Sequence, residues 1–337
     1  MDQLRSGSVS VNVNVNKTIK PPSFFISCDW GTSRFRIALV QSNPLKPVCS
    51  LSDSDGIKKI YNRWEASKNS NQEDFYVQIL SDKVAQLREK AGSNHDIDAL
   101  PVIISGMASS ELGLKHLPYQ LLPIPASANN LITHHKPAYP QFEHDIYLVS
   151  GLKTDDDIMR GEETLLLGVI AQHHIENGTV ILPGTHSKHI HIADGTIKEF
   201  TTFMTGELFE LLSTQSILSK TVEMPTNWND QEGFKEGLND SKRDGFMSQL
   251  FKIRSTSLLH DKKGAYNYFR LSGQLIGSEI KWLVQHSTNN IYVAGTYKLL
   301  LLYKLACKSY NCSCQIVKQS KDLLAAGHLQ IIINNTK

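Results

Sequence analysis

The sequence predicts a mixed α/β protein with two domains. The chain has 337 residues, more than the roughly 100–200 of a single typical domain. Short apolar runs bounded by turn residues predict strands, and they alternate with stretches of helical periodicity. A strand–turn–strand pattern centred on Gly-Thr occurs once in each half, at residues 31–32 and 184–185. We therefore expect a disordered tail over residues 1–22, an N-terminal domain over 23–155 and a C-terminal domain over 156–337.

The predicted elements of the N-terminal domain begin with a hairpin whose apolar runs span residues 24–28 and 35–40. Residues 74–92 follow a helical period and end at Gly92, as amphipathic helices often do. The run ending at Ser105-Gly106 predicts a buried strand, and residues 145–152 predict another. Three prolines in residues 116–126, between these two runs, require extended or looped backbone.

The C-terminal domain repeats this plan after a helix. Asp155 to Asp157 give the chemistry of a helix start, and Glu162 and Glu163 favour a helix N-terminus. A second hairpin has its turn at residues 183–188, and Asp194-Gly195 predicts a type I′ turn before a third strand. Thr205 is the expected N-cap of the next helix. Further helices are predicted in 227–260 and 266–284, followed by strand–helix pairs over 290–306 and 314–332.

Composition narrows the class of partner. Hydrophobic residues make up 40% and charged residues 20% of the chain, which is ordinary for a soluble globular protein. A net charge of +2 gives no footprint for nucleic acid, and no apolar run approaches the ~18 residues that span a bilayer. Five cysteines, an odd number, indicate free thiols and a cytoplasmic location. The oligomeric state stays open, with a homodimer as one alternative.

The two Gly-Thr turns carry the chemistry. Tight turns of this kind present backbone N–H groups and hydroxyls into one concavity, and such nests bind phosphate. Two of them, facing each other, would hold a polyphosphate between two domains. Asp29, at the start of the first turn, would organise the Mg²⁺ that accompanies ATP. A third glycine turn, at Gly295 before a helix, is expected to approach the nucleotide's sugar or base.

The sequence gives less support for other phosphate motifs and for metal sites. The chain contains neither G-x-x-x-x-G-K-[ST] nor G-x-G-x-x-G, the common phosphate motifs. His186, His189 and His191 lie close in sequence, but no acid completes a metal site with them. The spacing of Cys312 and Cys314 has no second pair, so we expect no zinc.

Several blocks resemble the 2-dehydro-3-deoxygalactonokinase family, within the sugar kinase/heat-shock chaperone/actin superfamily. They are "DWGTS", "SGM", "MRGEET", "LPGTHSK", "FMTGEL" and "LSGQLIGSEI", and the resemblance runs from about residue 25 to 327. It implies two actin-like ATPase (ribonuclease H-like) domains with the active site in the cleft between them. It also implies ATP-dependent phosphorylation of 2-dehydro-3-deoxy-D-galactonate at its 6-hydroxyl, in D-galactonate catabolism.

The candidate site residues follow from the turns and the resemblance together. The expected contacts to the ATP phosphates are Gly31, Thr32, Ser33, Gly184, Thr185 and Ser187. The resemblance places substrate contacts at Ser105, Gly106 and Met107.

Acid, base and charge roles fall on the "DIMRGEET" block and the second turn. Glu162 is the candidate base for the sugar hydroxyl, with Glu163 and Asp157 left open. Arg160 is expected to clamp the substrate's carboxylate, and Lys188 to neutralise the transferring phosphoryl group.

Two other functions compete with a sugar-acid kinase. One is an exopolyphosphatase-like phosphohydrolase that passes the phosphoryl group to water. The other is a non-enzymatic, ATP-binding regulatory protein on the same scaffold. The identity of the 2-keto-3-deoxy sugar acid, including its C4 stereochemistry, stays open at this point.

Overall fold

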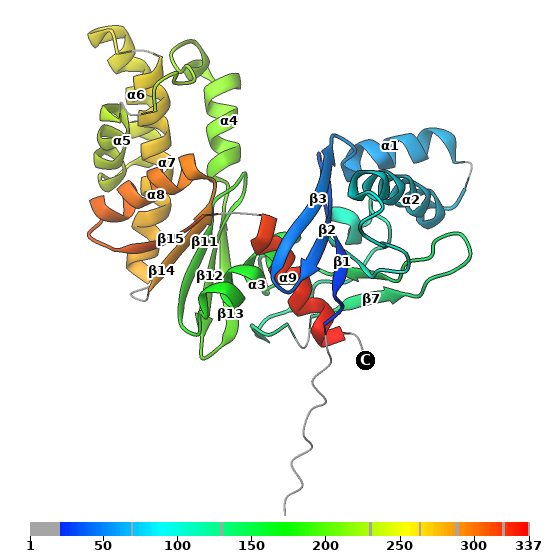
Figure 1. Cartoon of the computed structure of the whole chain (residues 1–337). Coiled ribbons are helices and arrows are strands. Elements are labelled where there is room, and N and C mark those ends of the chain that lie inside the picture. The colour runs from blue at the N-terminus through cyan, green and yellow to red at the C-terminus, as the bar shows by residue number, and fades with distance from the viewer. Residues whose placement is uncertain are drawn as a thin grey trace, which may run out of the picture.

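Two halves built around two six-stranded sheets make up the molecule (Figure 1). A computed structural model describes residues 21–68, 70–128, 131–228, 231–262, 264–286, 290–318 and 321–335. The predicted tail lies almost wholly outside these ranges, in residues 1–20. Among the helices of the described ranges, none is long and apolar enough to cross a membrane.

The N-terminal half has a sheet in the order β3-β2-β1-β4-β8-β7. Neighbours β1, β2 and β3 are antiparallel, β1, β4 and β8 are parallel, and β7 is antiparallel to β8. The strands are β1 (Phe24–Trp30), β2 (Phe35–Ser42), β3 (Leu45–Asp53), β4 (Val102–Gly106), β7 (Thr133–Lys136) and β8 (Ile146–Val149). Helices α1 (Ile57–Ser67) and α2 (Gln72–Ala91) cover one face, where the side chains of alternate strand positions form an apolar core.

The C-terminal half has a sheet in the order β15-β14-β11-β12-β13-β6. The strands are β6 (Ile124–Pro125), β11 (Gly178–Leu182), β12 (Ser187–Ala193), β13 (Thr196–Phe203), β14 (Ile291–Gly295) and β15 (Cys314–Lys318). The helices are α4 (Thr205–Gln215), α5 (Glu232–Lys242), α6 (Phe246–His260), α7 (Ala265–His286) and α8 (Tyr297–Ser309). In Figure 1, α4 to α7 rise above the sheet as a helical block.

The two sheets repeat one plan. In the first, β1, β2 and β3 form an antiparallel meander, and β4 and β8 add in parallel beside β1. In the second, β11, β12 and β13 form the same meander, and β14 and β15 add in parallel beside β11. The shared pattern of the two Gly-Thr hairpins therefore reflects a repeated sheet, and the expected mixed α/β fold with two related halves is confirmed.

Two helices join the halves. α3 (Glu162–His173) packs along α9 (Lys321–Asn335), and α9 also contacts β1 and β3 of the first sheet. One apolar core unites residues of both sheets with these helices, including Ile103, Leu166, Val180 and Ile331. The chain crosses between the halves a second time, because β6 pairs with β13. The domain boundary near residue 155 therefore stays a prediction from the sequence, because the core is continuous across it.

Small elements complete the connection between the sheets. A three-stranded ribbon is formed by β5 (Gln120–Leu121), β9 (Leu152–Lys153) and β10 (Ile158–Met159). Two single turns of 3₁₀ helix span Met107–Ser109 and Ile217–Lys220. The type I′ turn expected at Asp194-Gly195 is confirmed by positive φ at both residues, 50° and 62°.

Two local expectations are wrong. Thr205 is the first residue of α4, and Met204 precedes it without a side-chain cap. The run Asp155–Asp157 does not start a helix, since α3 begins at Glu162. In both cases the side chain has a tertiary partner: Thr205 donates to Glu279, and Asp157 accepts from Thr202. Tertiary hydrogen bonds have replaced local capping.

Candidate active site

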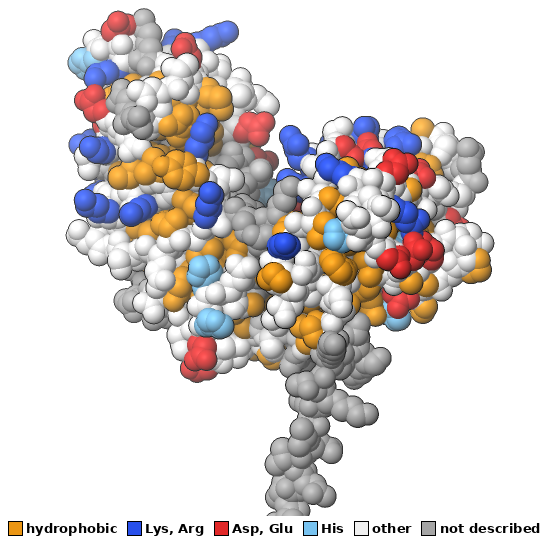
Figure 2. All heavy atoms as spheres, in the orientation of Figure 1, with side chains coloured by type: hydrophobic (Ala, Val, Ile, Leu, Met, Phe, Trp, Pro, Cys, Tyr) orange, Lys and Arg blue, Asp and Glu red, His pale blue; other side chains and the backbone are white. Residues whose placement is uncertain are grey.

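A cleft of about 500 Å³ lies between the two halves. Gly31, Thr32 and Gly106 line it from the N-terminal half, and Glu162 and Lys188 from the C-terminal half. Figure 2 shows the surface notched between the halves. The first hairpin therefore contributes its Gly-Thr pair to this concave site, and the second hairpin contributes His186 and Lys188.

The first turn is braced by the N-terminus of α1. The backbone N–H groups of Ile57 and Lys58 donate to the carbonyls of Gly31 and Thr32 at 2.9 and 3.1 Å. A Cβ on Gly56 would lie 2.4 Å from the Thr32 carbonyl oxygen, so only glycine permits this approach. The brace fixes the direction in which the turn presents its own N–H groups.

The second turn is braced in the same way by the N-terminus of α4. The Glu207 N–H donates to the Thr185 carbonyl at 3.0 Å. A Cβ on Gly206 would lie 2.4 Å from the Gly184 carbonyl oxygen. His186, in the turn, pairs with the Glu207 carboxylate at 2.5 Å. Each Gly-Thr turn is thus held by a helix start and a glycine that no other residue can replace without movement.

Asp29 lies at the end of β1 and lines the cleft. Arg36 Nη1, on the paired strand β2, is 2.5 Å from its Oδ2. Burial raises the pKa of Asp29 above its usual value, and the charge and hydrogen bond of Arg36 oppose this shift. Gly106, at the end of β4, packs closely against the end of β1, because a Cβ at this position would lie 2.8 Å from the Trp30 carbonyl oxygen.

Arg160 connects the two halves. Its Nη1 donates to the Ser109 carbonyl at 2.6 Å and to the Ser109 hydroxyl, and its Nη2 donates to the Leu117 carbonyl at 3.1 Å. The guanidinium lies 4.1 Å over the Tyr119 ring. Its fork is therefore already engaged by the N-terminal half, while the buried Nε has no hydrogen-bond partner among the described residues.

The three candidate acids have different surroundings. Glu162 lines the cleft, and its Oε1 lies 3.9 Å from Lys188 Nζ. Glu163 is buried and accepts from the Gly161 N–H at 2.6 Å, while burial and the charge of Glu162 raise its pKa to about 8. Asp157 accepts from the Thr202 N–H at 2.7 Å and its hydroxyl at 2.8 Å, outside the cleft lining. Of the three, Glu162 is the acid that faces the cleft.

Lys188 is the buried cation of the cleft. It stands on β12 directly after the second turn, and only 4% of the residue is exposed. A buried ammonium needs a compensating charge, and Glu162 is the nearest acid that contacts it among the described residues. An anion in the cleft would complete this compensation.

Six expected contacts lie outside the cleft lining. Two of them are Gly184 and Thr185 of the second turn, and Gly184 lines the adjoining aromatic pocket instead. The Ser187 hydroxyl is buried and donates to Glu279 at 2.7 Å. The Ser105 hydroxyl is buried against His328 Nε2 at 3.0 Å. Ser33 lines a neighbouring surface groove with Lys58 and Arg63. Gly295 ends β14, where a Cβ would meet Pro183 at 3.6 Å beside the second turn.

An aromatic pocket adjoins the second turn. It has a volume of about 120 Å³ and extends from Gly184 and Gly206 to Phe209, Trp228 and Tyr268. No sequence motif predicts it, because its rings come from α4, α7 and the loop before α5. Only the proximity of these elements in the fold reveals it.

The repeated sheet, the cleft and the two braced turns define a class: proteins of the actin-like ATPase fold, with two ribonuclease H-like halves. Within that class, the chain belongs to the 2-keto-3-deoxy-galactonokinase family, whose model matches residues 29–331.

Individual relatives are similar to this chain over most of its length. A probable 2-dehydro-3-deoxygalactonokinase of Rhizobium meliloti (strain 1021) is 31% identical over 303 residues, covering 87% of this chain and 92% of the relative. The 2-dehydro-3-deoxygalactonokinase of Escherichia coli (strain K12) is 27% identical, covering 86% and 90%. The crystal structure of a Sinorhizobium meliloti protein assigned to the same activity matches with a TM-score of 0.73 at 29% identity, covering 91% and 98%.

Proposed function

We propose that the protein transfers the γ-phosphoryl group of ATP to the 6-hydroxyl of 2-dehydro-3-deoxy-D-galactonate. The observation that carries the proposal is one cleft lined by the first braced turn and by His186 and Lys188 of the second hairpin, in a chain of this family. In phosphoryl transfer the protein mainly positions the reactants and neutralises charge, which is what such turns do. Phosphorylation of this sugar acid would serve D-galactonate catabolism in the cytoplasm.

The nucleotide is proposed to lie across both halves. Gly31, Thr32, Gly184 and Thr185 hold the phosphates through backbone N–H groups, while the buried Ser187 hydroxyl takes no part. The aromatic pocket beside Gly184 suits a purine base, since ring faces stack on one another favourably. Gly295, packed against Pro183, closes the same corner of the site.

Asp29 is proposed to hold Mg²⁺ through water. The ion takes one or two carboxylates together with phosphate oxygens and water, so a single partly exposed acid beside the first turn fits it. The bound ion would supply charge neutralisation at the phosphates. Arg36 keeps the Asp29 carboxylate oriented at the end of β1.

The sugar acid is proposed to lie between Met107, Gly106 and the "DIMRGEET" segment, all of which line the cleft. Glu162 orients the acceptor hydroxyl and takes its proton, as its exposure to the cleft allows. Lys188 faces the transferring phosphoryl group. Nη1 and Nη2 of Arg160 already donate to Ser109 and Leu117, so Arg160 is proposed to attract the substrate's carboxylate by its charge and not by a bidentate hydrogen bond.

A coupled ADP-release assay with a panel of 2-keto-3-deoxy sugar acids, including the C4 epimer, tests this proposal. We expect ADP release that depends on the sugar acid and is fastest with 2-dehydro-3-deoxy-D-galactonate. ADP release that no sugar acid accelerates would instead indicate the phosphohydrolase. Tight ATP binding without turnover would indicate the regulatory protein.

A further inference from the structure

Glu279 has a dense set of partners near the second turn, although it lies outside the lining of the cleft. Its side chain comes from α7 and is 1% exposed. Oε1 accepts from the Ser187 hydroxyl at 2.7 Å and contacts His189 Nε2 at 2.6 Å. Oε2 accepts from Thr205 at 2.6 Å and from the Tyr303 hydroxyl at 2.9 Å.

These partners satisfy a buried charge. A carboxylate offers about four acceptor positions, and four donor side chains occupy them here. Burial alone would raise the pKa of Glu279, but the charge of His189 and the surrounding donors lower it below its usual value. The group is therefore an anion whose hydrogen bonds are complete.

The partners also surround the second turn. Ser187 and His189 belong to β12, the strand that leaves the turn. Thr205 begins α4, whose next two residues, Gly206 and Glu207, brace the Gly184 and Thr185 carbonyls. One carboxylate thus fixes both the strand that follows the turn and the helix that supports it.

We propose that Glu279 is a positioning residue for phosphoryl transfer, which sets the geometry of the second Gly-Thr turn without touching the nucleotide. The inference rests on the proposed function, because it presumes that this turn holds ATP phosphates. It adds a buried anion from α7 to the apparatus that positions them.

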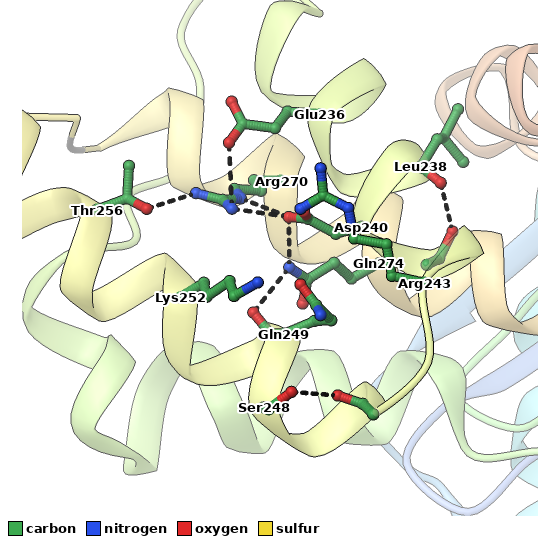
Figure 3. Close-up of polar contacts among 12 residues, drawn as sticks. Glu236, Leu238, Asp240, Arg243, Ser248, Gln249, Lys252, Thr256, Arg270 and Gln274 are labelled. Atoms are coloured by element: carbon green, nitrogen blue, oxygen red, sulfur yellow. Dashed lines mark hydrogen bonds and ion pairs between the residues drawn. The ribbon is translucent and has the colours of Figure 1, made fainter.

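The same half contains a buried carboxylate that serves as a matched comparison. Asp240, on α5, accepts from Arg270 Nε at 2.8 Å and from Gln274 at 3.0 Å, and Arg270 extends the network to Glu236 and Thr256 (Figure 3). These contacts join α5, α6 and α7 to one another, away from the second turn. Loss of the network should weaken packing and leave the turn in place.

The test compares Glu279→Gln with Asp240→Asn in the full-length protein, by steady-state kinetics and thermal unfolding. The amide that replaces the carboxylate cannot accept from all four donors, so the turn shifts. We expect the Glu279→Gln substitution to lower kcat/KM for ATP by about 10- to 100-fold, the scale that a 1 Å misplacement produces. The KM for the sugar acid should stay the same. Asp240→Asn should lower the unfolding temperature and leave both kinetic constants unchanged.

A second variant covers the case in which the Glu279→Gln protein does not fold. Thr205→Val removes one donor, at a position that is partly exposed. It should also lower kcat/KM for ATP, by a smaller factor, again with no change in the KM for the sugar acid. Kinetic constants for ATP that match those of the parent in the folded variants would overturn the proposal.

The role of Glu279 can be tested even if the proposed function is wrong. If the parent protein phosphorylates no sugar acid, the proposed function fails, and calorimetric titration with ATP then tests Glu279 alone. Weaker ATP binding in the Glu279→Gln variant, with Asp240→Asn unchanged, would still support a positioning role. Equal ATP affinity in all three proteins would refute it.

Discussion

At the scale of the residue, burial separates side chains that the sequence presents as equivalent. Glu162 and Glu163 are neighbours in one motif, yet one faces the cleft and the other is enclosed beneath Gly161. Two serines near the expected site, Ser105 and Ser187, have their hydroxyls turned to His328 and Glu279. The sequence pattern identifies segments that meet at the cleft, but the direction of each side chain follows from packing against residues far away in sequence.

Replacing Asp29 with Asn should lower turnover by at least ~100-fold, because it removes the charge that we propose organises the metal ion. The fold should persist, since the amide keeps the size of the side chain. Circular dichroism and the coupled ADP assay check both statements. Asp98→Asn, which disrupts the exposed pair with Arg88 in the same half, is the control and should be fully active. Near-normal turnover of the Asp29→Asn variant would show that Asp29 has only a structural role in the turn.

The buried Glu163 predicts an unusual pH dependence of stability. Its native pKa of about 8 lies above the ordinary value of 4.5, so the unfolded chain releases this proton first as the pH rises. The contribution of Glu163 to the free energy of unfolding therefore falls between about pH 4.5 and 8, by about 1.4 kcal/mol for each pH unit inside that window. Chemical denaturation across this window should show that Glu163→Gln removes this decline. An unchanged pH profile in the variant would show that Glu163 is ionised in the native protein.

At the scale of the element, each Gly-Thr turn is a composite of a hairpin and the start of a helix. The hairpins are predictable, because apolar runs flank Gly and Thr in both. The braces are not, because Gly56 and Gly206 look like ordinary loop glycines until α1 and α4 are placed against the turns. Strand β3 likewise gives a weak signal, because it is half-buried along its length, without a buried face that alternates cleanly.

Gly206→Ala tests the brace of the second turn. Its Cβ would lie 2.4 Å from the Gly184 carbonyl oxygen, so either α4 or the turn must move. We expect kcat/KM for ATP to fall by about 100-fold, since the phosphate contacts depend on the turn's geometry. Gly233→Ala creates a similar clash, 2.1 Å from the Tyr266 carbonyl oxygen, within the helical block. That control should lose stability but keep its kinetic constants; equal kinetic losses in both variants would reduce the brace to a matter of general stability.

At the scale of the whole molecule, two copies of one sheet plan share a core that α3 and α9 complete. The repeated hairpin predicts the duplicated sheet from the sequence, and the blocks that resemble the family predict the whole fold. The sequence does not predict the shared core, because α9, near the C-terminus, places His328 between Ser27 and Ser105. This long-range contact ties the end of the chain to strands β1 and β4, next to the cleft.

The central claim is that one ATP molecule is held by both turns, with the sugar acid between them. A crystal structure with a non-hydrolysable ATP analogue, Mg²⁺ and 2-dehydro-3-deoxy-D-galactonate tests it most directly. We expect phosphate oxygens within hydrogen-bond distance of the N–H groups of both Gly31–Thr32 and Gly184–Thr185, and the 6-hydroxyl beside Glu162. Phosphates that contact only one turn, or a sugar acid bound outside the cleft, would contradict it.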